Sequence, residues 1–178
     1  KGMESSSQVS ITDMREANVV VTHLCIRVAE KYDATLVHLG SAMEHDVLRT
    51  DTYVQTKRLA STLIRDARAC SAGTFRSVRL SLHNVYGPRV KGVVADIAKQ
   101  HWRGRPAVLR QPTATRDFVF ASDVSHAVIK AIEVGDASEP IPIGSGVGTP
   151  ISEIAELLSV HSRVKPPWTA ATRKSAEA

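Results

Sequence analysis

The segment Tyr53-Val-Gln-Thr-Lys57 places a phenol and an ammonium group four positions apart. On a helix, side chains with this spacing share one face, with their Cβ atoms about 5–6 Å apart. A neighbouring cation stabilises phenolate and lowers the pKa of a tyrosine from about 10 toward neutrality. Such a tyrosine can act as a general acid or base. Many helices carry this spacing by chance, so the pair alone indicates proton transfer only weakly.

Ser41 is the residue that could turn this pair into a site. It comes directly after Thr35–Leu39 and Gly40, and the apolar run predicts a buried strand. In open parallel sheets, ligands bind at the carboxyl ends of the strands. A serine hydroxyl there could polarise a substrate oxygen while Tyr53 moves its proton and Lys57 tunes Tyr53. The alternative is structural: Ser41 caps the following turn and Lys57 is a solvated surface residue.

The elements that must position these residues alternate along the first half of the chain. Helical spacing predicts helices over Asp13–Lys31 and Thr52–Cys70, and alternation predicts a strand over Ser77–Leu82. Such alternation predicts an α/β layered domain with a parallel sheet. The second half predicts helices at Val93–Trp102, Asp123–Val134 and Ser152–Leu158, strands at Ala107–Leu109, Phe118–Phe120 and Ile141–Ile143, caps at Ser122 and Ser152, and a loose tail from His161.

Composition narrows the class of protein. The 178 residues suit one domain, or one domain with a small appendage. A net charge of +5 suits a phosphate-bearing ligand or simply a mildly basic surface, and 4% aromatic residues are too few to suggest a nucleic-acid platform. No apolar run approaches a membrane span. Cys25 and Cys70 form no disulfide or metal pattern, so we expect a cytoplasmic protein without a metal, a nucleic-acid partner or a membrane partner.

Several motifs follow one another between about residues 6 and 158. They are Asn18-Val-Val-Val-Thr22, Leu39-Gly-Ser-Ala42, Tyr53-x-x-x-Lys57, Asn84-Val-Tyr-Gly-Pro-Arg89, Arg116-Asp-Phe-Val119 with Ser122-Asp-Val124, and Ile143-Gly-Ser-Gly146 with Ser152-Glu153. In this order they resemble the extended short-chain dehydrogenase/reductase family, the NAD-dependent epimerases and dehydratases that act on nucleotide sugars. The resemblance implies an incomplete Rossmann-like sheet with flanking helices and a small C-terminal substrate-binding lobe.

The resemblance also implies residue roles. Ser41, Tyr53 and Lys57 would be catalytic; Asn18, Tyr53, Lys57, His83 and Val85 would contact NAD or NADP; Asn84 and Arg116 would contact the substrate. Two structural alternatives stay open, because Asn18 could simply end a helix and Arg116 could form a surface salt bridge with Asp117. The Gly144–Gly148 loop is expected to be a turn near the substrate lobe rather than a phosphate cradle.

The implied function is an NAD(P)-dependent oxidoreductase, epimerase or dehydratase acting on a nucleotide-activated sugar. The segments Gly92–Ala95 and Arg103–Pro106, together with the Arg116 motif, are similar to those of the 4-ketoreductases of deoxysugar pathways. The alternative is an inactive, truncated relative that serves as a sugar-nucleotide-binding or scaffold subunit. We expect residues 1–90 to form the partial Rossmann-like domain and residues 91–178 to form mostly the lobe, with 118–143 returning to the domain. A homodimer through the helices Asp13–Lys31 and Thr52–Cys70 is implied.

The chain departs from the family pattern in three places. No Gly-x-x-Gly-x-x-Gly follows an N-terminal strand, the lobe lacks its last part, and Ser41 and Tyr53 are only twelve positions apart, about half the usual family distance. Without the earlier strands, Thr35–Leu39 becomes an exposed apolar edge, which invites pairing. We therefore expect either an obligate partner or a longer chain.

Overall fold

The computed structural model describes residues 10–171. The chain divides into two compact units. One extends to His83 and also contains Asp123–Ile143; the other contains Asn84–Ser122 and the chain from Gly144 onward. We refer to them as the sheet unit and the second unit.

The sheet unit is built on three parallel strands in the order β1-β2-β6. Strand β1 (Leu36–Ser41) pairs with β2 (Ser77–Leu82) along its whole length, and β2 pairs with β6 (Ile141–Ile143). The predicted α/β class with a parallel sheet is thereby confirmed. Within the described residues, β1 has a strand neighbour on one side only, so it forms an edge of this sheet.

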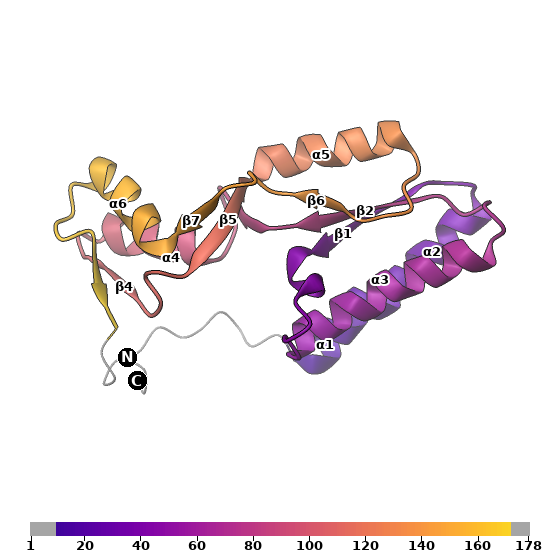
Figure 1. Ribbon diagram of the computed structural model, residues 1–178, viewed down its shortest axis with the longest axis horizontal. Helices are drawn as coiled ribbons and strands as arrows, with labels where there is room; N and C mark the ends of the chain where they lie inside the picture. Colours follow the sequence, from indigo (N-terminus) through magenta and orange to yellow (C-terminus); the bar gives the residue numbers. More distant parts are fainter. Residues whose placement is uncertain (1–9, 172–178) are drawn as a thin grey trace. The chain divides into compact units, whose positions relative to one another are not determined.

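Helices cover both faces of this sheet (Figure 1). On one face lies α5 (Ala121–Val134), and on the other lie α2 (Val21–Lys31) and α3 (Thr52–Cys70). Helix α3 begins at the predicted residue because the side chain of Asp51 caps it, accepting a hydrogen bond from the Val54 amide at 3.2 Å.

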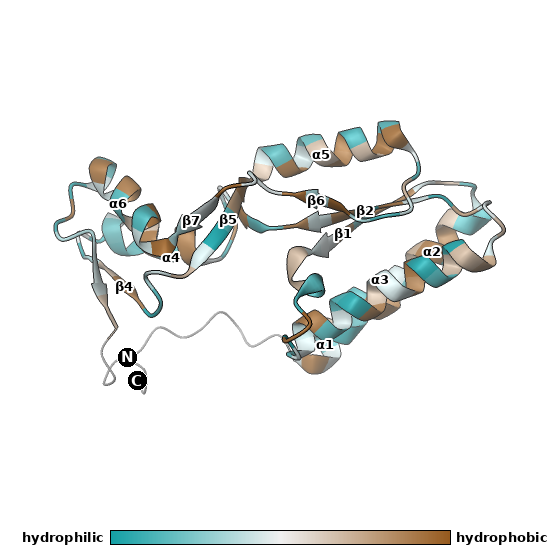
Figure 2. Cartoon of the chain, viewed as in Figure 1, coloured by the Kyte–Doolittle hydropathy of each residue, from teal (hydrophilic) through white to brown (hydrophobic). Residues whose placement is uncertain are grey.

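The two faces of the sheet are packed differently. On the α5 face, Val78 and Leu80 pack against Ala131, and Figure 2 shows hydrophobic residues along β2 and β6. On the other face, the apolar cluster includes Ile26 of α2 and Ile64 of α3. Because side chains alternate along a strand, Arg79 and the residues two positions before and after it on β2 point to this second face.

The predicted first helix is continuous but not uniform. It consists of α1 (Ile11–Arg15), a π-helical turn η1 (Glu16–Val20) and α2. A short 3₁₀ helix, η2 (Ala42–His45), follows β1. Within the described residues, no helix is long and apolar enough to cross a membrane.

In the part of the second unit that the structure describes, there are two helices and two small sheets. Strand β5 (Thr115–Phe120) lies between β3 (Asn84–Tyr86), which is parallel to it, and β7 (Gly148–Pro150), which is antiparallel. Strands β4 (Ala107–Leu109) and β8 (Trp168–Ala170) form a parallel pair. Helices α4 (Val93–Trp102) and α6 (Ile151–Ser162) enclose a core that includes Ile97 and Ala155.

Three local predictions were wrong. Helix α5 begins at Ala121, so Ser122 lies inside it rather than capping it. The N-cap of α6 is Pro150, not Ser152. The tail is not loose throughout, because Trp168–Ala170 pairs with β4.

Candidate active site

Ser41 lies at the carboxyl end of β1, as predicted. It is only 8% exposed, and its Oγ accepts a 3.3 Å hydrogen bond from the Met43 amide. Its own amide donates to Oε1 of Glu44 at 2.6 Å, which closes a capping box around η2. The structural alternative, Ser41 as a cap, is therefore realised, and its Oγ still carries a proton to donate.

Lys57 is held against the same end of the strand. Its Nζ donates to the carbonyl oxygen of Leu39 at 3.0 Å, two residues before Ser41. Burial lowers the pKa of Lys57, and the charge of Glu44 opposes that shift. The ammonium is thus an inward-directed group at the strand end rather than a solvated surface residue.

Tyr53 lies one helical turn before Lys57 in the first turn of α3. Its side chain is 40% exposed, and within residues 10–171 its hydroxyl has no hydrogen-bond partner. The carbonyl oxygen of Tyr53 accepts from Thr56 Oγ1 at 2.9 Å. The phenol is therefore available to a ligand, while Lys57 donates to the strand and not to the phenol.

Asn18 is tied to the helix that carries Tyr53 and Lys57. It lies within η1, and its Nδ2 donates to Thr56 Oγ1 at 3.0 Å. The alternative of a helix-terminal Asn18 is wrong, since the helix continues through it into α2. Hydrogen bonds thus connect Asn18 to the backbone of Tyr53 through Thr56.

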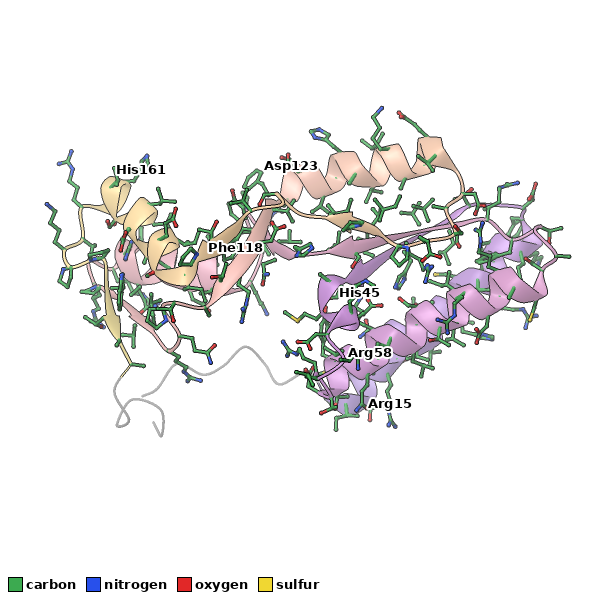
Figure 3. The ribbon with its side chains drawn as sticks, in the orientation of Figure 1. Arg15, His45, Arg58, Phe118, Asp123 and His161 are labelled. Atoms are coloured by element: carbon green, nitrogen blue, oxygen red, sulfur yellow. The ribbon has the colours of Figure 1, made fainter. Side chains whose placement is uncertain are left out.

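The short connection between Ser41 and Tyr53 is organised by residues that the sequence analysis missed. Arg58 of α3 donates to the carbonyl oxygens of Glu44 and Arg49 at 2.9 Å each, and also to that of Asp46. Figure 3 shows Arg58 beneath the end of this loop near His45. Glu44 binds Ser41 with one carboxylate oxygen and Ser61 Oγ with the other, at 2.5 Å.

One signal could have revealed Glu44. Ser41-Ala-Met-Glu44 has the Ser-x-x-Glu spacing of a capping box. Gly40 leaves room for this carboxylate, because a Cβ there would lie 2.8 Å from Glu44 Oε1 and the Glu44 side chain would have to shift. His83, which follows β2, donates its amide to the carbonyl oxygen of Ile143 at 3.0 Å.

Asn84, Val85 and Arg116 belong to the second unit. Asn84 and Val85 lie in β3, and Asn84 Nδ2 donates to the carbonyl oxygen of Asp117 at 3.2 Å. A cavity of about 350 Å³ is lined by both, together with Lys91. Arg116 is exposed, donates to the Thr115 carbonyl oxygen at 2.9 Å and does not line this cavity.

Asp117 holds the Gly144–Gly148 loop rather than pairing with Arg116. Its carboxylate accepts from the amide and hydroxyl of Ser145 at 2.7 Å each, and from the Gly146 amide at 3.0 Å. A Cβ at Gly144 would collide with this carboxylate. The loop is therefore a turn bound to an acidic side chain. This arrangement agrees with the predicted turn and is unfavourable for binding a phosphate.

The family model of the NAD dependent epimerase/dehydratase family matches residues 2–144. The chain belongs to this family. The match confirms the family predicted from the motifs and the predicted class of cofactor. It covers the strand-end serine, the Tyr-Lys helix and β3.

Relatives agree with this assignment. A dTDP-6-deoxy-L-talose 4-dehydrogenase (NAD(P)(+)) from Kitasatospora kifunensis is 30% identical over 174 residues, which cover 85% of this chain and 54% of the relative. The chain thus spans about half the length of the curated relative that it matches.

Solved structures share the fold. The UDP-glucose 4-epimerase of Thermotoga maritima, solved with UDP-glucose, has a TM-score of 0.77 and 18% identity over 94% of this chain and 62% of that chain. The UDP-glucose 4-epimerase of Thermus thermophilus, solved with NAD, has a TM-score of 0.72 and 21% identity over 96% of this chain and 62% of that chain.

The described residues of the sheet unit fit the reactive end of such a cofactor. Ser41, Tyr53 and Lys57 present a strand-end hydroxyl, a ligand-accessible phenol and an ammonium, which are hydrogen-bond donors of the kind that the ribose of this cofactor would need.

Proposed function

We propose that the protein is an NAD(P)-dependent oxidoreductase, epimerase or dehydratase acting on a nucleotide-activated sugar. The observation that carries the proposal is the 3.0 Å hydrogen bond from Lys57 Nζ to the Leu39 carbonyl oxygen. It brings a cation to the strand end that Ser41 occupies, one helical turn from Tyr53. A cation, a phenol and a hydroxyl at the carboxyl end of a parallel strand suit proton transfer beside a nucleotide.

The proposed roles divide the work among three side chains. Tyr53 would accept the proton of the sugar hydroxyl, or return it, as carbonyl and alcohol interconvert. Ser41 Oγ would donate a hydrogen bond to the same oxygen, and Lys57 would favour the phenolate by its charge. A bound nicotinamide supplies or accepts the hydride at the sugar carbon. Lys57 and Tyr53 would also hold the nicotinamide ribose, with Asn18, His83 and Val85 as further cofactor contacts.

The proposed substrate is a dTDP- or UDP-linked hexose. Asn84 would contact the sugar nucleotide, which is supported by its place on the wall of the 350 Å³ cavity. Arg116 would reach the diphosphate, and its exposed guanidinium is free of carboxylate partners within the described residues. The name of the Kitasatospora relative supports chemistry at carbon 4, so we place 4-keto reduction first among the reactions.

The second candidate is a subunit that binds sugar nucleotides without turnover. The observation that favours it is the capping role of Ser41, which a purely structural residue would also fulfil. In either case we propose a homodimer through α2 and α3. Exposed apolar side chains along α2, among them Val21, Leu24 and Val28, support this interface.

Replacing Tyr53 by Phe tests the proposal. The change removes one exposed hydroxyl, so folding is expected to persist while turnover falls by roughly 10²–10⁴-fold, the usual contribution of a general acid or base. Hydride transfer is followed as the absorbance of the reduced nicotinamide at about 340 nm. Each assay pairs a dTDP- or UDP-hexose with NAD or NADP. Tyr32→Phe is the matched control, since Tyr32 is 68% exposed at the end of α2.

Unchanged turnover in Tyr53→Phe would reject the catalytic assignment. Binding of a sugar nucleotide by a wild-type protein that shows no turnover with any pair would support the second candidate instead.

A further inference from the structure

A second cavity lies inside the sheet unit, between α3 and the face of the sheet that α5 does not cover. Its volume is about 860 Å³. Four of its charged lining residues are arginines and two are glutamates: Arg58, Arg65, Arg68, Arg79, Glu44 and Glu139. Cations therefore outnumber carboxylates on its wall, unlike an ordinary interface between a helix and a sheet.

Three of these charged side chains already bind other groups of the protein through hydrogen bonds or an ion pair. The guanidinium of Arg58 donates to three carbonyl oxygens of the loop after β1. Arg68 forms a two-armed ion pair with Asp136. The carboxylate of Glu44 is taken by the Ser41 amide and the Ser61 hydroxyl. These contacts leave Arg65 and Arg79 as the cations with spare donors.

Of the two, Arg79 is the more buried and has the greater need of a counter-ion. It lies in the middle of β2, is half-buried, and makes one side-chain hydrogen bond, from Nη2 to the carbonyl oxygen of Ser138 at 2.6 Å. Within residues 10–171 no carboxylate lies within ion-pair distance of it. Burial lowers the pKa of Arg79; Glu139 and Glu44 oppose that shift, and Arg65 and Arg68 add to it. The charges of Glu139 and Glu44 act on Arg79 only from beyond ion-pair distance, so Arg79 is a half-buried cation without a directly bound counter-ion, which is unfavourable.

Arg65 lies within electrostatic range of Arg79 and has little else to bind. Its ion pair with the adjacent Asp66 is long, at 3.8 Å, and both side chains are more than 60% exposed. Two neighbouring guanidinium groups repel one another, and an oxyanion between them removes the repulsion and accepts several hydrogen bonds.

We propose that this cavity binds a small oxyanion of the phosphate type between Arg65 and Arg79. Thr62 lines the same cavity and adds a hydroxyl donor. The site is separate from the serine, tyrosine and lysine of the candidate active site, and it does not depend on the proposed function.

The test is a titration of the full chain with inorganic phosphate, followed by calorimetry and by melting temperature. Ionic strength is held constant with sodium chloride, because general screening also changes stability. Wild type is expected to show saturable binding. Arg79→Gln and Arg65→Gln should each weaken it by about ten-fold or more, since each removes a charged hydrogen-bond donor.

Two control variants locate the binding. Arg105→Gln removes an exposed arginine of the second unit and should bind phosphate as wild type does. Arg116→Gln should keep the phosphate binding that depends on Arg65 and Arg79, and any phosphate binding that it removes belongs to the proposed substrate site. Arg65 is exposed, so its variant stays informative even if Arg79→Gln fails to fold.

Equal effects of phosphate and chloride at matched ionic strength would overturn the proposal. Saturable phosphate binding that survives in both Arg65→Gln and Arg79→Gln would also overturn it. Neither outcome bears on turnover, so the proposed enzyme activity stands or falls separately.

Discussion

The two faces of the sheet in the sheet unit differ in what they pack. Toward α5, Val78 and Leu80 meet Ala131 in a continuous apolar cluster. Toward α3, Ser81 and several charged residues line a cavity, and the apolar packing is the cluster around Ile26 and Ile64. The α5 face therefore contributes mainly stability, while the α3 face accommodates polar groups.

The largest effect on stability is expected on the α5 face. Leu80→Ala removes a side chain that is 1% exposed and should cost about 3 kcal/mol of unfolding free energy, within the usual range for buried leucines. Urea unfolding measures the loss. Leu48→Ala is the matched control, because Leu48 is 88% exposed and should change stability by less than about 0.5 kcal/mol. A loss below that of the α3-face variants would contradict the comparison.

A smaller loss is expected on the α3 face. Glu44→Gln keeps the shape of the side chain but leaves one of two donors, the Ser41 amide or the Ser61 hydroxyl, facing an NH₂ group. The expected cost is about 2 kcal/mol, typical of an unsatisfied buried donor. Unfolding of Glu44→Gln and of the exposed control Glu156→Gln is compared. Equal stability of the two variants would show that the carboxylate does not organise this loop.

The smallest effect is a pH dependence of the α3 face. Burial, with the charges of Lys57 and Arg79, lowers the pKa of His38 from 6.5 to about 4. Between these values the unfolded chain binds a proton that the folded chain does not, so stability falls as pH falls. From pH 7 to 5.5 the expected loss is about 1 kcal/mol.

Urea unfolding at the two pH values measures this loss. His38→Gln should abolish it, whereas His126→Gln, on the exposed side of α5, should retain it. An unchanged pH dependence in His38→Gln would assign the titration to another group.

The sequence predicted the strong local elements to the residue. Thr52–Cys70 and Ser77–Leu82 are the observed α3 and β2, because periodicity and flanking polar residues agree there. It did not predict β7 or β8. Gly148–Pro150 and Trp168–Ala170 are three-residue strands whose only support is pairing with distant segments, which a local pattern does not contain.

The sequence predicted which residues form the candidate site but not which groups they contact. The strand-end position of Ser41 followed from the apolar run before it. The partners of Lys57 and Asn18, a Leu39 carbonyl oxygen and Thr56, depend on how α3 lies against β1 and η1, which spacing does not define. Glu44 was accessible to sequence reasoning through its capping-box spacing and was overlooked.

The π-helical turn at Glu16–Val20 has a consequence for the history and engineering of this helix. Such a turn is equivalent to one residue inserted into an α-helix, and one residue changes the helical phase by about 100°. Deleting a residue here would restore a regular helix and rotate everything on one side of the deletion. Asn18 would then lose its alignment with Thr56. The extra residue therefore changes the rotation of the helix at this point, so that α1 and α2 present differently oriented faces to α3.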